Sequence, residues 1–102
     1  LPAAKIHILN CHAAAREAVD NPTAQAAARA IGQSASTIHS PSHSLGLALY
    51  GALAIAYDQL GMEADWTHYQ RFAAEEYAKM ETALREIAIE DEPHPAKIEW
   101  RC

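Results

Sequence analysis

Two histidines, His39 and His43, lie on either side of a Ser-Pro pair in the segment STIHSPSHSLG. Imidazole nitrogens are common zinc ligands, and a His-x-x-x-His spacing on a continuous helix would place both rings on one face. Pro41 interrupts the helix between them, so a third ligand such as His12 or Cys11 would have to come from elsewhere. No CxxC or HExxH motif supports such a site. We predict that the two histidines are structural and bind no metal, with a site formed by His39, His43 and His12 as the alternative.

The sequence contains no arrangement that is typical of a hydrolytic enzyme. Serines and histidines are frequent, but there is no G-x-S-x-G motif and no strand pattern to hold a nucleophile on a sharp turn. We therefore predict a protein without enzymatic activity and without a cofactor. A metal-binding module or metal-dependent enzyme that uses the two histidines is the alternative.

The composition indicates one small domain. Hydrophobic residues make up 50% of the 102 residues, but much of this share is alanine, and only 7% of the chain is aromatic. Small side chains fill a core only if the helices that carry them approach each other closely. No run reaches the roughly 20 apolar residues that span a membrane. Two cysteines, Cys11 and Cys102, do not make a disulfide framework, which favours a cytoplasmic location.

The formal net charge of −5 is unevenly distributed along the chain. Residues 1–62 contain three acidic and three basic residues, and the remaining ten acidic and five basic residues all follow residue 62. Binding to nucleic acid rests on lysines and arginines that neutralise phosphates, so this balance argues against it. A basic protein partner is better suited to such a surface. The alternative is that the acidic residues form an ordinary solvated helix face.

Strand signals are absent from the sequence, whereas helix signals recur with clear breaks between them. We predict a single all-α domain over residues 1–102, built as a small helical bundle with Ala-rich close packing. The four expected helices cover about residues 3–19, 22–38, 41–60 and 65–90, and the tail covers 91–102.

Prolines, glycines and capping residues set the expected helix ends. The residue before a proline avoids the α conformation, so Asn21 and Ser40 are expected as N-caps, each followed by a proline in the first helical position. Gly61 is expected to end the third helix, and Asp65 to cap the fourth.

Helical spacing also predicts which sides of the helices are buried. The second and third helices are expected to cross closely along Ala28, Gly32, Ala35, Ala48, Ala52 and Ala56. The fourth helix is expected to bury a stripe that consists of Trp66, Tyr69, Ala73, Tyr77, Met80, Leu84 and Ile87. Its other side carries Arg71, Glu75 and Lys79 at i,i+4 spacing, which marks the solvent side.

The tail cannot continue the last helix through Pro93 and Pro95. Ile98 and Trp100 alternate with polar residues, which suits an extended segment that lies on the helices. We therefore predict a C-terminal strap in which Ile98 and Trp100 are docked.

The middle of the chain resembles a known family. Its pattern has an AAR-x-A segment, which is AAREA at residues 14–18 here, and then AARA-x-G-[HQ]-x-x-x-T-x-H followed by a His-x-x-x-His step into a helix of small residues. The matching residues are Arg16, Arg29, Gly32, Gln33, Thr37, His39, His43 and Tyr50. On these residues, over roughly His12 to Tyr57, the chain resembles the immunity-protein-five-like family of bacterial polymorphic-toxin systems.

The resemblance implies a small helical protein, without enzymatic activity, that neutralises a cognate bacterial toxin by binding it directly. It carries over no binding residues. The charge asymmetry, taken with the resemblance, nominates the acidic residues Glu75, Glu76, Glu86, Glu90, Asp91 and Glu92 as the surface that meets a basic toxin domain. Exposed aromatic residues among Tyr69, Phe72 and Trp100 are the candidates for its apolar centre. A helical homo-oligomer whose Ala-rich faces pair between chains is a further alternative.

Overall fold

The computed structural model describes residues 2–100, which contain four α-helices and no β-strand. The helices are α1 (Pro2–Glu17), α2 (Pro22–Ser36), α3 (His43–Leu60) and α4 (Trp66–Ile87). The all-α class and the four helices are confirmed. The helix ends differ from the expected ones by up to three residues, the largest difference being the earlier end of α4.

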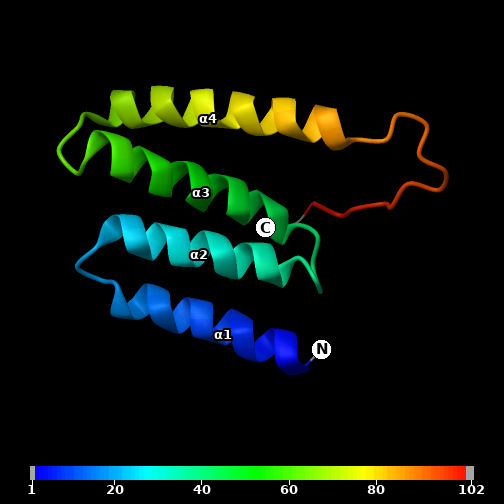
Figure 1. Ribbon diagram of the computed structural model, residues 1–102, viewed down its shortest axis with the longest axis horizontal. Helices are drawn as coiled ribbons and strands as arrows, with labels where there is room; N and C mark the ends of the chain where they lie inside the picture. Colours follow the sequence, from blue (N-terminus) through cyan, green and yellow to red (C-terminus); the bar gives the residue numbers. More distant parts are fainter. Residues whose placement is uncertain (1, 101–102) are drawn as a thin grey trace.

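The four helices lie side by side in chain order, each antiparallel to the one before it (Figure 1). Within the described residues, α1 packs on α2, α2 on α3 and α3 on α4, and no other pair of helices is in contact. Short connections favour such antiparallel neighbours. The helices therefore form an array in which α1 and α4 are the two edges and each has a packing partner on one side only.

The core of the array is small and consists mainly of alanine. The buried alanines are Ala15, Ala26, Ala30, Ala52 and Ala56, and the only larger apolar residues buried among the described ones are Ile8 and Tyr69. Ala52 and Ala56 expose 0% and 1% of their surface. Alanine-lined faces let helix backbones approach closely, but each methyl group removes little apolar area from water. Within the chain, these alanines lie where α1, α2, α3 and α4 pack on their neighbours.

Gly32 faces a different helix from the one expected. A Cβ at this position would lie 3.2 Å from His12 Cε1 and 3.3 Å from Cys11 Cβ, both on α1. The close approach between α2 and α3 instead involves Gly46, whose added Cβ would lie 2.5 Å from Gln33 Oε1. The prediction that Gly32 lines the α2–α3 contact is therefore wrong. Because α2 is the second helix of the array, it uses small residues on two opposite sides.

The two Pro-containing connections differ from each other. Asn21 caps α2 as predicted, because its Oδ1 accepts a hydrogen bond of 3.1 Å from the N–H of Ala24. Ser40 does not cap α3, which begins at His43. The carbonyl of Ser40 instead accepts a 3.1 Å hydrogen bond from the N–H of His43, which closes a tight turn. Pro41 occupies the second position of this turn, where its fixed φ is favoured.

The connection between α3 and α4 follows the prediction more closely. Gly61 ends α3 with a φ of 71°, a conformation that glycine adopts without steric cost. Asp65 occupies the N-cap position of α4, where its backbone carbonyl accepts from the N–H of Tyr69. Its side chain makes no capping hydrogen bond.

The expected stripe of α4 is only partly buried. Tyr69 is buried, and Ala73 and Met80 are half-buried. The other four members expose large fractions of their surface, namely Trp66 69%, Tyr77 38%, Leu84 63% and Ile87 77%. The expectation of a fully buried stripe is therefore wrong. The cause is that α4 packs on α3 alone, and one helix covers only part of so wide an apolar side.

Residues 88–100 contain no helix, as expected after α4, and in Figure 1 this segment turns back toward the start of α3. The two residues of this segment that were expected to dock are exposed. Ile98 exposes 36% of its surface and Trp100 exposes 58%. The prediction that both side chains pack on the helices is therefore wrong.

Candidate protein-binding surface

Glu75 and Glu86 project from one side of α4. Glu75 follows Trp66 by nine residues, about two and a half turns, and Glu86 follows Tyr77 by the same spacing. Both carboxylates therefore lie on the side of α4 opposite Trp66 and Tyr77. Both glutamates are exposed. This is the side that the i,i+4 charge spacing marked as facing solvent.

Three further acidic residues, Glu90, Asp91 and Glu92, follow the end of α4 and are exposed. The last carbonyl groups of a helix carry a partial negative charge of their own. The C-terminal end of α4 therefore adds to the negative potential of these carboxylates. We call Glu75, Glu86, Glu90, Asp91 and Glu92 the acidic surface.

Glu76 does not belong to the acidic surface, although the sequence analysis included it. It is buried, exposing 9% of its surface, and its Oε1 lies 2.9 Å from Lys79 Nζ. This hydrogen bond, and the charge of Glu76, raise the pKa of Lys79 above its ordinary value. A sequence signal for this burial exists, because Glu76 follows the buried Tyr69 by seven residues, close to two whole turns.

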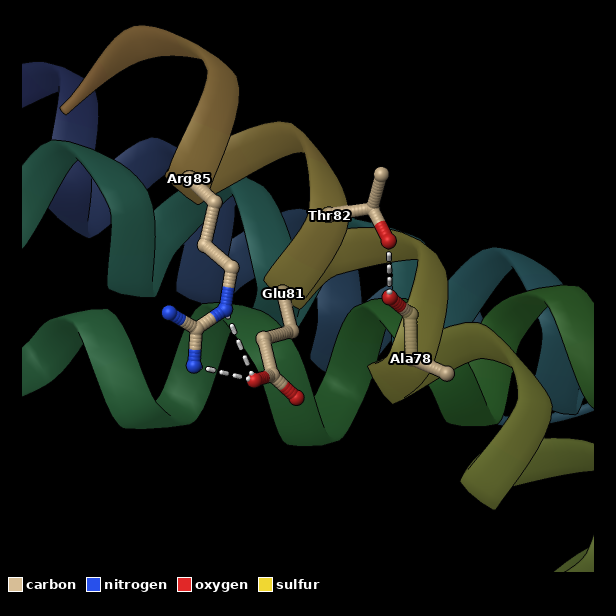
Figure 2. Close-up of polar contacts among 4 residues, drawn as sticks. All are labelled: Ala78, Glu81, Thr82 and Arg85. Atoms are coloured by element: carbon tan, nitrogen blue, oxygen red, sulfur yellow. Dashed lines mark hydrogen bonds and ion pairs between the residues drawn. The ribbon is translucent and has the colours of Figure 1, made fainter.

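The second half of α4 also carries a basic residue that is already paired (Figure 2). Arg85 donates to Glu81 Oε1 from Nε at 3.0 Å and from Nη2 at 2.7 Å, and both side chains are exposed. Beside this pair, the Thr82 hydroxyl donates to the carbonyl of Ala78 at 3.0 Å. An exposed pair contributes at most about 1 kcal/mol to stability. Its main effect is that the charge of Arg85 is balanced by Glu81. The exposed Arg71 and Lys79, each four residues from Glu75, lie on the same side of α4 as Glu75.

The three aromatic candidates differ in exposure. Tyr69 is buried, donates its hydroxyl hydrogen to the carbonyl of Gly61, and packs edge-on against Tyr57 with ring centroids 5.8 Å apart. It is a core residue and cannot contact a partner. Phe72 is half-buried and lies one turn before Glu75, and Trp100 is exposed. These two aromatic residues are therefore at least partly exposed.

The two histidines of the α2–α3 corner lie close together. His43 is the first residue of α3, and His39 lies in the turn that follows α2. Their ring centroids are 6.1 Å apart with the rings nearly perpendicular. The Nδ1 atom of His43 is 2.8 Å from Gln33 Oε1. Because an amide oxygen only accepts, Nδ1 carries the hydrogen in this contact, which ties the start of α3 to α2.

One cavity contains all three histidines of the metal alternative. His12, His39 and His43 line it together with Lys5 and the buried Ser36. Ser36 donates to the carbonyl of Gly32 at 2.8 Å. Across residues 2–100, no three His, Cys, Asp or Glu side chains are placed to hold a metal ion. The structure therefore brings the three histidines to one cavity without arranging them as metal ligands.

The other family-motif residues are spread over the array. Arg16 is exposed on α1, whereas Arg29 lines a groove between α2 and α3 together with Tyr50. Thr37 ends α2, and its hydroxyl donates to the carbonyl of Ser34 at 2.7 Å. Of these residues, Thr37 makes a hydrogen bond that closes the end of its own helix. The motif residues of α2 and α3 therefore position the helices and do not form part of the acidic surface.

Sequence reasoning missed an exposed apolar groove between α3 and α4. It has a volume of about 390 Å³ and is lined by Leu49 and Leu53 from α3 and by Trp66, Tyr69 and Tyr77 from α4. Leu49 exposes 59% of its surface. Nothing in the spacing of these residues distinguishes them from core residues, because their period is that of a buried helix side.

Gly46 provides a test of the contact between α2 and α3. We expect Gly46→Ala to displace the Gln33 side chain, which a Cβ would approach to 2.5 Å, and so to break the hydrogen bond to His43. Urea unfolding gives the change in the free energy of unfolding that Gly46→Ala causes. This change should be less favourable by about 1–2 kcal/mol in the wild-type protein than in the Gln33→Ala variant. Equal effects in the two backgrounds would show that Gln33 is not what the new methyl group meets.

The structure is that of a small all-α protein that exposes both charged and apolar side chains. The chain belongs to the family described as Imm-5 like putative immunity protein, whose family model matches residues 1–83. The resemblance found in the sequence is thereby confirmed, and the match extends from α1 into α4. No curated protein and no solved structure matches the chain.

Two further observations bear on the expectations from composition. In the part of the chain that the structure describes, no helix is both long enough and apolar enough to cross a membrane. Cys11 is a free, half-buried thiol, and Cys102 lies outside the described residues.

Proposed function

We propose that this protein is an immunity protein that neutralises a cognate bacterial toxin in the cytoplasm by binding to it directly. The observation that carries the proposal is membership of the immunity-protein family over residues 1–83. Neutralisation by binding requires a stable complementary surface and no reacting group. The protein accordingly acts without enzymatic activity and without a cofactor.

The acidic surface indicates the chemistry of the partner. Glu75 and Glu86 are exposed on one side of α4, and Glu90, Asp91 and Glu92 are exposed beyond its C-terminal end. Of the basic residues of α4, Lys79 and Arg85 are paired with Glu76 and Glu81, and Arg71 is exposed. A basic toxin domain, such as one that binds nucleic acid, is complementary to this surface. Charge complementarity of this kind mainly raises the association rate, and salt screens it beyond roughly 8 Å under physiological conditions.

Two aromatic residues are candidates for the apolar part of the interface. Phe72 is one turn from Glu75, and Trp100 is exposed in the segment that carries Glu90 to Glu92. Aromatic residues that become fully desolvated contribute most of the binding energy in typical interfaces, with charged residues at the rim. Phe72 and Trp100 supply affinity in this proposal, and the carboxylates supply rate and selectivity.

The proposal is tested in bacterial cells that produce the toxin domain encoded beside the gene for this protein. Production of the toxin domain alone should arrest growth, and production of this chain with it should restore growth. An unrelated acidic helical protein at the same level is the control and should give no protection. Continued growth arrest, despite accumulation of the folded chain in the cells, would overturn the proposal.

A further inference from the structure

The chain exposes more surface to solvent than is typical of a folded monomer of the same mass. Its accessible surface is 7695 Å². By the usual scaling of surface with mass, a folded monomer of 11.1 kDa exposes about 5,700 Å². The excess is therefore about 2,000 Å². The exposed segment after α4 contributes part of this excess, and the exposed apolar side chains of the helices contribute as well.

One exposed apolar surface runs along the whole of α4. Tyr77 and Leu84 follow Trp66 by 11 and 18 residues, close to three and five whole turns, so the three side chains form one line. Ile87 lies one turn beyond Leu84. We call Trp66, Tyr77, Leu84 and Ile87 the α4 stripe. Each of its members is exposed, by 38% to 77%. Over 22 residues the helix is about 33 Å long, so the stripe has the length of a helix–helix contact.

No helix of the described chain covers the α4 stripe. α4 is an edge of the array and packs on α3 alone, so its flank beside the stripe has no neighbour (Figure 1). The apolar groove between α3 and α4 opens beside Trp66 and Tyr77 and continues the apolar surface toward Leu49. Apolar residues at helical spacing over a whole helix, with charged residues on the opposite side, are typical of a helix whose apolar side is covered.

We infer that a second copy of this chain covers the α4 stripe, so that the protein is a homodimer with its two α4 helices packed antiparallel across a two-fold axis. In such an interface the same surface of both copies is in contact, so the α4 stripe of each copy covers the α4 stripe of the other. Obligate homodimers bury about 2,000–5,000 Å² in total, or about 1,000–2,500 Å² per chain. The excess surface of one chain is of this size.

A second copy fits the stripe better than the toxin does. A toxin is bound only when it is present. An apolar stripe that stays exposed in the free protein promotes aggregation, which a second copy of the chain prevents by covering it. Glu75 and Glu86 lie on the opposite side of α4, so these two carboxylates of the acidic surface stay open in the homodimer. The two surfaces of α4 thus have different occupants.

The experiment measures the mass of the protein by sedimentation velocity, from low micromolar to near-millimolar concentration. The wild-type chain should sediment at twice the chain mass. Replacing Leu84 and Ile87 with glutamate should give single chains. The matched control replaces Ile6 and Leu9, which have the same i,i+3 spacing and are 58% and 54% exposed on α1, and should leave the dimer intact. A wild-type chain of single mass, or a dimer that is lost only in the α1 variant, overturns the inference.

A second measurement keeps the inference testable if the Leu84 and Ile87 variant does not fold alone. Tyr77 lies at the middle of α4, so an antiparallel pair places the two copies of residue 77 near the axis. With the two native cysteines replaced by serine, Tyr77→Cys should form a disulfide-linked dimer on mild oxidation, whereas Glu75→Cys on the opposite side should not. Equal cross-linking of the two variants, or none in either, contradicts the antiparallel α4 pair. Neither experiment contains the toxin, so the result is independent of the proposed function.

Discussion

Replacing Glu86, Glu90 and Asp91 with lysine is expected to slow association with the toxin domain severalfold at low salt. The three residues are exposed and lie at the C-terminal end of α4, where their carboxylates add to the partial charge of the helix end. A basic partner approaching this end meets an attractive potential in the wild-type protein and a repulsive one in the variant. Stopped-flow mixing gives the association rate, and the difference between the two proteins should shrink as salt is raised.

The chain offers a matched control for this charge reversal. Glu17, Asp20 and Asp58 are the three acidic residues of the first 62, and all are exposed. Replacing them with lysine changes the net charge by the same amount at sites away from the acidic surface. This variant should keep most of the wild-type association rate. If the two triple variants slow association equally, net charge alone matters and the acidic surface is an ordinary solvated face.

Replacing Tyr69 with alanine is expected to destabilise the protein by about 3–5 kcal/mol. Tyr69 is the one aromatic side chain of α4 that is buried, and it packs edge-on against Tyr57 while donating its hydroxyl hydrogen to the carbonyl of Gly61. It therefore fixes α4 to the end of α3 by two kinds of contact. Because small domains are stable by only about 5–15 kcal/mol, this loss is a large fraction of the total. Urea unfolding followed by circular dichroism measures it.

The variant Tyr69→Phe separates the ring from the hydroxyl group. It keeps the contact with Tyr57 and removes only the hydrogen bond to Gly61, so it should cost about 0.5–1.5 kcal/mol. An alanine variant that unfolds at the same urea concentration as the wild type would show that Tyr69 does not hold α4 in place. A phenylalanine variant as unstable as the alanine variant would show that the hydrogen bond, not the ring packing, carries the stability.

Helix positions were predictable from the sequence because their signals act within a few residues. Asn21 before Pro22 caps α2, and Gly61 ends α3, as the local rules require. Ser40 before Pro41 satisfies the same rules, but it begins a tight turn over residues 40–43, and α3 begins only at His43. Local preference therefore predicts a break in the helix at Ser40 and Pro41, but it does not decide between an N-cap and a tight turn at Ser40.

Burial was less predictable because it depends on which helix lies opposite. The spacing of Trp66, Tyr77 and Leu84 is that of a buried helix side, and yet these side chains are exposed because α4 packs on α3 alone. Glu76 shows the reverse case, since its spacing from Tyr69 predicts burial although its charge suggests exposure. The direction that Gly32 faces also depends on where α1 lies, and no local signal records that.

The central claim, direct binding to a toxin, is tested most directly by calorimetric titration of the purified chain into the purified toxin domain encoded beside its gene. The account predicts saturable binding at a fixed ratio of chain to toxin, with the activity of the toxin falling in step with the fraction bound. A toxin domain that gives no binding signal and keeps its full activity in excess of the folded chain would contradict the account.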